Sequence, residues 1–401
     1  MKRLVSLAFL VFLVCAVVVN VAFADKKTVT IWYYWETPKH QQTLARVCSD
    51  FNASQGDIQV VTKYIPFADF KKQLSIGAAA AELPDIAILD NPDHASYSSM
   101  GIFADLTDKL ASWPDLKQYF EGPLNSCKLN GRLYGIPFGS NCLALYYNED
   151  MLKAAGVKPP TNWDELKSVS LKLTKGNVHG FAISSLQNEE GTFGFLCFLW
   201  GSGNTSFEIN NANGIRALTL LHDLVASDAM PKEALNWTQG DVMNQFISGN
   251  LAMMVNGPWQ VPTMRQQGPN LKWSVVLLPV GKKPASDLGG ENFAVVKGNN
   301  VDEAVAFLKF AANPAEMKTY INDFGYIASR KDVATTQFTN DPIMKVFVAQ
   351  MAYAQPRGPH PRWPEISDAV SLAFNESITG VATPAAAAAK AQKAIDGILG
   401  K

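Results

Sequence analysis

Charge is scarce in this sequence, and no segment of the mature chain is strongly basic. Asp, Glu, Lys and Arg make up only 18% of the 401 residues. Residues 1–24 hold two of the 35 basic residues and none of the 36 acidic ones, so the remainder has 33 basic and 36 acidic residues, a net charge of −3. A basic patch that would attract a nucleic acid or an anionic membrane is therefore missing. We predict no nucleic-acid partner.

Cysteine is also rare, and the motifs of common catalytic sites are missing. The chain has five cysteines, of which Cys15 lies in an N-terminal apolar run. The other four, Cys48, Cys127, Cys142 and Cys197, allow three disulfide pairings. Cys127 and Cys142 flank one expected strand region, so they are the pair we expect if a disulfide forms. Because no G-x-S-x-G, H-E-x-x-H, phosphate loop or metal-ligand spacing is present, we predict no catalytic residue, metal or cofactor.

Only the N-terminus has a long apolar run. Leu4–Val19 follows Lys2 and Arg3, and Ala22-Phe23-Ala24 after it is a small-x-small cleavage site. This order predicts a secretory signal peptide, residues 1–24, and export to the periplasm or the outer face of the cytoplasmic membrane. A retained membrane helix is the alternative, but the run is short for one. A lipid anchor at Cys15 would need a small residue before the cysteine, and a valine stands there.

Strand and helix signals alternate along the rest of the chain, which is long enough for two domains. Apolar or alternating runs predict strands at residues 28–32, 58–64, 143–148, 180–184, 251–255 and 271–278. Amphipathic runs predict helices at residues 41–51, 67–81, 188–200, 213–227 and 301–311. Capping signals predict further helix starts at Thr161, Asn313 and Thr383, and an Asn-Gly pair at Asn130 predicts a hairpin. This alternation is typical of an α/β protein.

One stretch, FISGNLAMMVNGPW at residues 246–259, combines several of these signals. A short apolar strand is bounded by Gly249 and by Asn256-Gly257-Pro258. Pro258 suits the first turn of a helix, so Trp259 is expected just inside a helix start, where a strand has ended. Ligands of α/β proteins bind at such strand ends, and an indole offers a flat apolar face. The alternative is a core tryptophan on a strand–helix turn.

The same stretch resembles the extracellular solute-binding proteins of bacterial ABC importers, the class that includes the maltose-binding protein. The resemblance lies in a Phe, a Gly three residues later, a hydrophobic strand with Met254, and Asn-Gly-Pro-Trp. It extends over nearly the whole mature chain and is strongest with sugar-binding members. It implies a type II periplasmic-binding-protein fold, with two doubly wound α/β lobes joined by crossing hinge strands. The N-terminal lobe would comprise residues 25–138 and 286–335, and the C-terminal lobe residues 139–285 and 336–401.

The first lobe and the first crossing supply five candidate ligand contacts. Trp35 and Glu36 end an aromatic run after the first strand, where the family has a ligand-contacting residue. Asp90 and Asn91 match the polar end of a later family strand, and Asn141 matches a hydrogen-bonding position at the crossing. Helix capping for the Asp90 region and a plain turn for Asn141 are the alternatives.

The remaining candidates come from later segments. Besides Trp259, they are Gly290, Glu291 and Asn292 at the expected return crossing, and Arg357 and Trp363 in a proline-rich segment. Paired glycines let backbone N–H groups approach a ligand, and a guanidinium can pair two hydroxyls or a carboxylate. A hairpin-like turn and a surface charge are the alternatives. At the start of the helix expected at 188–200, Glu189, Glu190 and Phe193 are further candidates, and a solvated helix face is the alternative for the two acids.

The resemblance implies a monomeric binding protein rather than an enzyme. It would bind a mono- or oligosaccharide in an interlobe cleft and deliver it to the membrane permease subunits of an ABC transporter by hinge closure. One alternative is a secreted glycoside hydrolase, although the sequence offers no pair of carboxylates placed across a scissile bond. Another is a relative that binds a glycerophosphodiester or a polyamine. A phosphate ligand would require more clustered Arg or Lys, and a polyamine would require more acidic residues.

Overall fold

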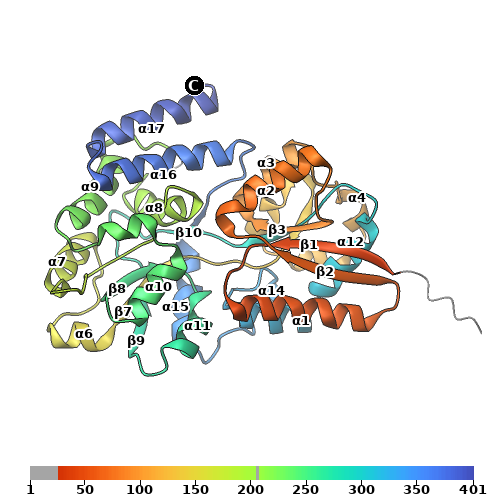
Figure 1. Cartoon of the computed structure of the whole chain (residues 1–401), viewed down its shortest axis with the longest axis horizontal. Coiled ribbons are helices and arrows are strands. Elements are labelled where there is room, and N and C mark those ends of the chain that lie inside the picture. Colours follow the sequence, from red (N-terminus) through yellow and green to blue (C-terminus); the bar gives the residue numbers. More distant parts are fainter. Residues whose placement is uncertain (1–25, 205–206) are drawn as a thin grey trace, which may run out of the picture.

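The chain folds into two α/β lobes that lie side by side (Figure 1). The computed structural model describes residues 26–204 and 207–401. The predicted signal peptide at residues 1–24 lies outside the described residues. Within the described part of the chain, no helix is both long enough and apolar enough to cross a bilayer. The alternating strands and helices confirm the predicted α/β class.

The first lobe is built on a five-stranded sheet with the order β2-β1-β3-β11-β6. β1 runs parallel to β2 and β3, whereas β11 runs antiparallel to β3 and β6. The strands are β1 (Lys27–Tyr33), β2 (Ile58–Tyr64), β3 (Ile86–Asp90), β6 (Gly135–Pro137) and β11 (Glu291–Val295). The helices are α1 (Pro38–Ser54), α2 (Phe67–Ala80), α3 (His94–Ser99), α4 (Thr107–Leu110), α5 (Glu121–Ser126), α12 (Val301–Ala311), α13 (Pro314–Phe324) and α14 (Lys331–Ala334).

The second lobe is built on a three-stranded antiparallel sheet with the order β8-β7-β9. These strands are β7 (Ala144–Asn148), β8 (Met253–Asn256) and β9 (Trp273–Val276). The helices are α6 (Glu149–Ala154), α7 (Trp163–Leu173), α8 (Glu189–Gly201), α9 (Ala212–Ala226), α10 (Gln239–Ile247), α11 (Gln260–Gln267), α15 (Pro342–Gln350), α16 (Trp363–Thr379) and α17 (Pro384–Leu399). The two C-terminal helices, α16 and α17, pack against each other and against α9 (Figure 1).

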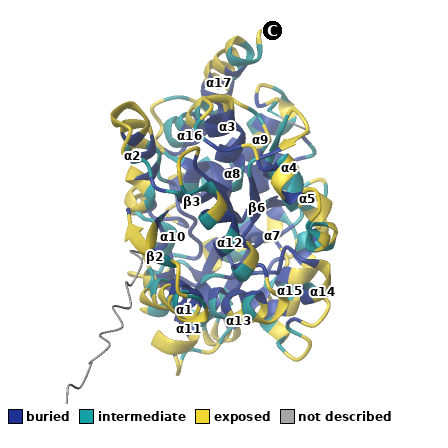
Figure 2. Cartoon of the chain, turned by 90° about the vertical axis from the view of Figure 1, so that its right-hand side faces the viewer, coloured by how far each residue is buried: buried dark blue, intermediate teal, exposed yellow. Residues whose placement is uncertain are grey.

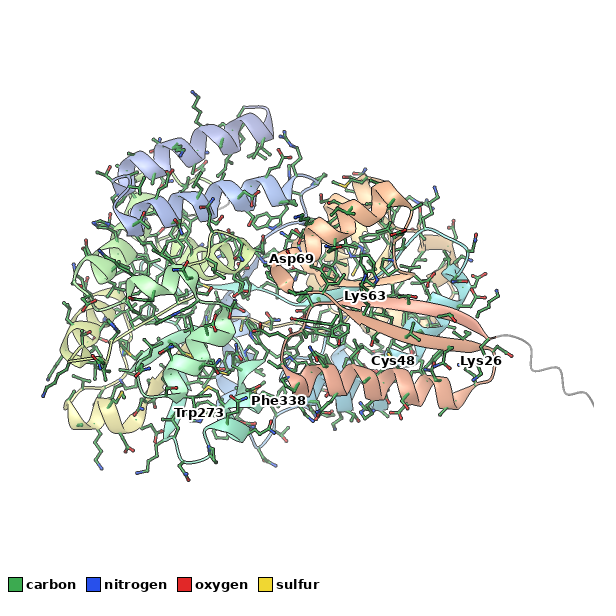
Figure 3. The ribbon with its side chains drawn as sticks, in the orientation of Figure 1. Lys26, Cys48, Lys63, Asp69, Trp273 and Phe338 are labelled. Atoms are coloured by element: carbon green, nitrogen blue, oxygen red, sulfur yellow. The ribbon has the colours of Figure 1, made fainter. Side chains whose placement is uncertain are left out.

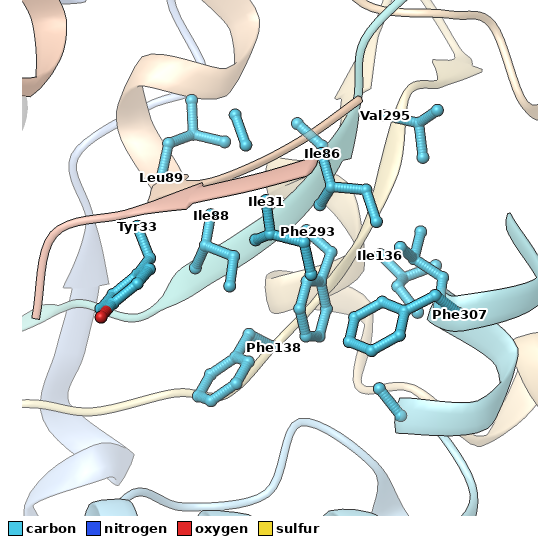
Figure 4. Packing of buried hydrophobic residues seen from close by; sticks show 14 of the residues in the cluster. Ile31, Tyr33, Ile86, Ile88, Leu89, Ile136, Phe138, Phe293, Val295 and Phe307 are labelled. Atoms are coloured by element: carbon cyan, nitrogen blue, oxygen red, sulfur yellow. The ribbon is translucent and has the colours of Figure 1, made fainter. Parts of the chain in front are cut away.

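The two lobes have separate hydrophobic cores. The first core gathers side chains around the five-stranded sheet, among them Phe138 and Phe293 (Figure 4). Two further clusters fill the second lobe, and Trp273 and Phe338 pack against one of them (Figure 3). Figure 2 shows the buried residues in the interior and the exposed ones at loops and outer helix surfaces. Each lobe therefore has its own hydrophobic core, and the segments that connect the lobes hold them together.

The chain passes between the cores three times, and these crossings bond to one another. Backbone bridges join Asn141 to Gly289 and Ser140 to Ile327. Nearby, β10 (Ser286–Leu288) pairs in parallel with β12 (Ala354–Pro356). Gly290 has φ +130°, a conformation that favours glycine, and an added Cβ there would overlap the Gly139 carbonyl oxygen. Gly289 and Gly290 thus allow two of the crossing segments to approach each other closely.

Several predicted elements are confirmed, and two are wrong in detail. β2 and α12 have the predicted bounds, and Asn130 and Gly131 both have positive φ between β4 (Lys128–Leu129) and β5 (Arg132–Leu133), as a hairpin turn requires. The strand predicted at 180–184 is not a regular strand. It makes only isolated parallel bridges to the segment before and within β8, at His179–Leu251 and Ala182–Met254. Leu251, the first residue of the strand predicted at 251–255, makes one of these isolated bridges and does not pair within the sheet. The regular strand β8 therefore begins two residues later, at Met253.

The capping and disulfide predictions also need correction. The side chain of Asn162, rather than that of Thr161, accepts the capping hydrogen bond at the start of α7, and Thr161 donates to Glu165. Cys127 and Cys142, the predicted pair, are free thiols, as are Cys48 and Cys197. Cys127 belongs to the first core and Cys142 to a core cluster of the second lobe, so they are not partners. Burial raises the pKa of all four thiols, which makes them unreactive.

Candidate ligand-binding site

A cavity that is partly open to solvent lies between the two lobes, and its space amounts to about 770 Å³ when the open solvent at its mouth is included. Side chains of both lobes and of the crossing segments line it. The lining residues are Tyr34, Trp35, Glu36, Thr37, His40, Phe67, Asp90, Asn141, Glu189, Glu190, Phe193, Gln239, Trp259, Gln260, Gly289, Gly290, Glu291, Tyr326 and Arg357. No group of three or more potential metal ligands is arranged to hold an ion among the side chains that the structure describes.

Eight of the eleven predicted site residues line this cavity. They are Trp35, Glu36, Asp90, Asn141, Trp259, Gly290, Glu291 and Arg357. The other three do not. Asn91 begins a 3-10 turn, and Asn292 points to the opposite face of β11 from Glu291, where its amide donates to Ser126. Trp363 is fully buried, and its indole N–H donates to the Glu189 carboxylate.

The turn that carries Trp259 has a specific local construction. β8 ends at Asn256, whose side-chain oxygen accepts from the Gly257 N–H, and the Tyr146 hydroxyl donates to the Gly257 carbonyl at 2.7 Å. A Cβ at Gly257 would overlap the Trp259 ring, so the glycine gives the indole its place. The ring lies 6.2 Å from Phe193 and 6.3 Å from Tyr326, centroid to centroid. Trp259 therefore packs against the cores of both lobes while it lines the cavity.

Glu291 is held by an aromatic cage at the base of the cavity. Its Oε1 accepts from the Tyr34 hydroxyl at 3.1 Å, the Trp35 indole at 3.3 Å and the Tyr326 hydroxyl at 2.9 Å. Its Oε2 is buried without a hydrogen-bond partner. Burial, followed by the nearby charge of Asp90, raises the pKa of Glu291 to about 7 in spite of these donors.

Arg357 lies at the centre of a second arrangement, which we call the paired cluster: Arg357, Lys71, Asp90, Asp93, Glu189 and Asp287. The Arg357 guanidinium makes two hydrogen bonds of 2.6 Å to Asp90 and one of 2.6 Å to Glu189. Its Nε lies 3.5 Å from Asp287, and Lys71 lies 3.0 Å from Asp93 and 3.4 Å from Glu189. Because Asp90 ends β3 and Glu189 begins α8, the cluster joins the two lobes.

The pKa values in the paired cluster show how far the positive charges of Arg357 and Lys71 offset the effect of burial on each carboxylate. Burial raises the pKa of Glu189, but the charges of Lys71 and Arg357 outweigh it and hold this pKa below its ordinary value. For Asp90 the burial effect is larger than that of Arg357, so its pKa is raised. Asp287 also has a raised pKa, because of burial. The guanidinium lies 4.4 Å from the Phe193 ring centre, which adds a cation–π contact.

Glu36 and Glu190 differ from the paired cluster, and with Glu291 they form what we call the open acidic group. The Glu190 Oε2 accepts from the Gln239 N–H at 2.7 Å and from Ser184 at 3.4 Å. Burial, followed by the charge of Glu36, raises the pKa of Glu190 to about 7. Burial and the charge of Asp241 also raise the pKa of Glu36. Within the described residues, none of the open acidic group forms an ion pair.

The sequence did not indicate several of the lining residues, and it indicated three others only as further candidates. Glu189, Glu190 and Phe193, the further candidates, all line the cavity, so the solvated-face alternative for the two acids is wrong. Tyr34 is not among the predicted contacts; its ring is buried, but its hydroxyl donates to Glu291. Gly289, the partner of Gly290 in the glycine pair, also lines the cavity, and the other lining residues carry no local signal: Thr37, His40, Phe67, Gln239, Gln260 and Tyr326.

Two α/β lobes, three crossings and a partly open cavity between the lobes define a two-lobed solute-binding protein. The chain belongs to the family described as bacterial extracellular solute-binding protein, which matches residues 46–346. The predicted family membership and fold are thereby confirmed, and members of the family are solute-binding proteins.

Relatives and solved structures support this assignment. The chain is 25% identical over 332 residues to the multiple sugar-binding protein of Streptococcus mutans, covering 76% of each chain. It is 26% identical over 331 residues to the lactose-binding protein of Rhizobium radiobacter, covering 77% of this chain and 75% of that one. An ABC transporter solute-binding protein from Thermotoga lettingae, solved with α-D-tagatose bound, superposes with a TM-score of 0.87 at 25% identity, covering 93% of this chain and 100% of that one.

Proposed function

We propose that this protein is the solute-binding component of an ABC sugar importer. It binds a mono- or oligosaccharide in the interlobe cavity. The observation that carries the proposal is the lining of that cavity, where the rings of Trp259, Phe193 and Tyr34 lie beside carboxylates and amides. Aromatic faces pack on the C–H surfaces of sugar rings, and the polar groups accept hydrogen bonds from hydroxyls. Relatives named as multiple sugar-binding and lactose-binding proteins support the same ligand class.

We further propose that ligand binding closes the lobes about the three crossings. Residues 25–138 with 286–335 would move as one body, and residues 139–285 with 336–401 as the other. A ligand that contacts Trp35 in one lobe and Trp259 in the other binds the closed state more tightly than an open one, so it shifts the population toward closure. Membrane permease subunits would then receive the ligand from the closed protein.

In this proposal the exported protein acts as a monomer in the periplasm or at the outer face of the cytoplasmic membrane. It returns its ligand chemically unchanged, which separates it from a glycoside hydrolase. Incubation with maltose or a mixture of oligosaccharides, followed by chromatography, tests this directly. New shorter products would contradict the proposal.

A panel of sugars tests the binding function. A sugar that binds only the folded state raises the melting temperature, and calorimetry then gives its dissociation constant. Trp259→Ala should weaken binding of the best sugar about tenfold or more, because it removes an aromatic platform. Trp113→Ala is the matched control, since Trp113 packs on the first core and does not line the cavity. No response to any sugar, or equal affinity of Trp259→Ala and wild type, would overturn the proposal.

A further inference from the structure

The acidic groups that line the cavity outnumber the basic ones. Among the described residues, five carboxylates line it, those of Glu36, Asp90, Glu189, Glu190 and Glu291, together with one guanidinium. That guanidinium, of Arg357, already binds two of the five carboxylates within the paired cluster. His40 also lines the cavity, but burial lowers its pKa to about 4, so its ring is neutral at pH 7. The open acidic group is therefore left without a cation of the protein.

Glu36 and Glu190 both reach the N-terminus of α10 (Gln239–Ile247), Glu36 from the first lobe and Glu190 from the second. Glu36 follows β1 of the first lobe, and its carboxylate lies against the backbone of Gly240 in the first turn of α10, where an added Cβ would be 2.5 Å from Oε1. Glu190 lies in the first turn of α8 and accepts from the N–H of Gln239, the first residue of α10. The N-terminus of α10 offers only about half a positive charge, and Asp241 in the same turn opposes it.

Within the part of the chain that the structure describes, five buried polar atoms of cavity-lining residues have no hydrogen-bond partner, and three of them are side-chain oxygens that accept; the other two are His40 Nε2 and Arg357 Nε. Glu291 Oε2, Asn141 Oδ1 and Gln260 Oε1 have no hydrogen-bond partner, and their residues are 6%, 3% and 2% exposed. Buried acceptors without donors are costly, so a ligand that fills this space gains most by bringing donors. An ammonium group has three donors and no acceptor, and it also carries the missing positive charge.

We propose that the ligand is an amino sugar, whose protonated amine binds between Glu36 and Glu190 while its hydroxyls donate to Glu291, Asn141 and Gln260. This inference rests on the proposed function, since it specifies the class of sugar. The ammonium bridges carboxylates of both lobes, so it favours closure by removing the repulsion between them. A neutral sugar of the same shape leaves that repulsion in place.

The inference is tested by calorimetry at pH 7, which compares the affinity of a sugar that has a free amine with that of a similar sugar that has none. The probes are D-glucosamine with D-glucose and with N-acetyl-D-glucosamine, and the disaccharide of glucosamine with cellobiose. We expect the amine to bind about tenfold or more tightly than its neutral partner, because a charge-assisted hydrogen bond is stronger than a neutral one. Its advantage should shrink as the salt concentration rises, since the Glu36 carboxylate is exposed to solvent.

Two substitutions separate charge from shape. Glu190→Gln keeps an acceptor for the Gln239 N–H and removes the charge, so it should bring the affinity ratio of amine to neutral sugar close to one. Glu121→Gln, on an exposed turn of α5 outside the cavity, should leave the ratio unchanged. Equal or weaker binding of the amines by wild type would overturn the inference and leave the sugar-binding function intact. If no sugar of either kind binds and spermidine does, both proposals are wrong.

Discussion

The paired cluster and the open acidic group line the same cavity, and they differ in what neutralises their carboxylates. In the paired cluster, the guanidinium of Arg357 meets Asp90 from one lobe and Glu189 from the other at 2.6 Å. In the open acidic group, the partners of Glu291 and Glu190 are neutral hydroxyl, indole and amide groups. Similar carboxylates are therefore used in two ways: one set joins the lobes, and in our proposal the other provides acceptors for a ligand.

Removing Arg357 should produce the largest effect, because it converts the paired cluster into an unpaired one. Arg357→Met leaves Asp90, Glu189 and Asp287 buried with only Lys71 nearby. We expect the free energy of unfolding to fall by about 3–5 kcal/mol at pH 7, the usual cost when one partner of a buried ion pair is deleted. Urea denaturation of the ligand-free protein measures this change.

Arg265→Met is the matched control for that substitution. Arg265 makes a two-point contact with Asp341 at 2.9 and 2.8 Å, but at the surface, where such pairs contribute less than about 1 kcal/mol. If the two variants lose similar stability, the buried position of Arg357 has no special role, and the contrast between the two groups of carboxylates fails.

Local signals explain why much of the fold could be predicted from the sequence. β2 consists mainly of β-branched and aromatic residues, and α13 begins with Asn313-Pro314, where the Asn side chain caps the helix as expected. The segment at 180–184 misled because its apolar run looks like a strand, whereas its pairing depends on a segment about 70 residues away in the chain. Strand identity in such a case depends on tertiary contacts that no local pattern encodes.

The site residues also include some that the sequence could predict and some that depend on tertiary contacts. The rule that ligands bind at strand ends led to Trp259, and the resemblance to the family led to Trp35, Glu36 and Asp90. Neither could separate Glu291 from Asn292, which face opposite sides of one strand. The partners of Arg357 also could not be predicted, since Asp90 is 267 residues away and Glu189 is 168 residues away. Trp363 was wrongly placed because nothing local shows that a tryptophan at a helix start is covered.

A second prediction concerns the pH dependence of the open acidic group. The pKa of Glu291 is about 7 in the folded protein, above its ordinary value of 4.5. Between these values the folded state binds more protons than the unfolded state, so ionisation of Glu291 lowers the stability as pH rises from 4.5 to 7. Glu291→Gln removes this contribution, and its amide oxygen can still accept from Tyr34, Trp35 and Tyr326.

Urea denaturation between pH 5 and pH 8 measures that contribution as a difference between two curves. Relative to wild type, Glu291→Gln should become more stable by roughly 2 kcal/mol from pH 5 to pH 8, since one unit of pKa shift corresponds to about 1.4 kcal/mol. Glu121→Gln should show a flat difference curve. A flat curve for Glu291→Gln as well would mean that the aromatic cage holds a carboxylate as easily as water does.

The smallest effect is expected from Lys71, the second cation of the paired cluster. Its side chain is 31% exposed, and it lies 3.0 Å from Asp93 and 3.4 Å from Glu189. Lys71→Met should lower the free energy of unfolding by about 1 kcal/mol, because the Lys71 side chain is partly exposed and Arg357 still neutralises Glu189. Lys109→Met, which breaks the exposed pair with Asp302, should cost less. If Lys71→Met lost as much stability as Arg357→Met, Lys71 and Arg357 would act as one unit. The bidentate contact of Arg357 to Asp90 would then not by itself distinguish the paired cluster from the open acidic group.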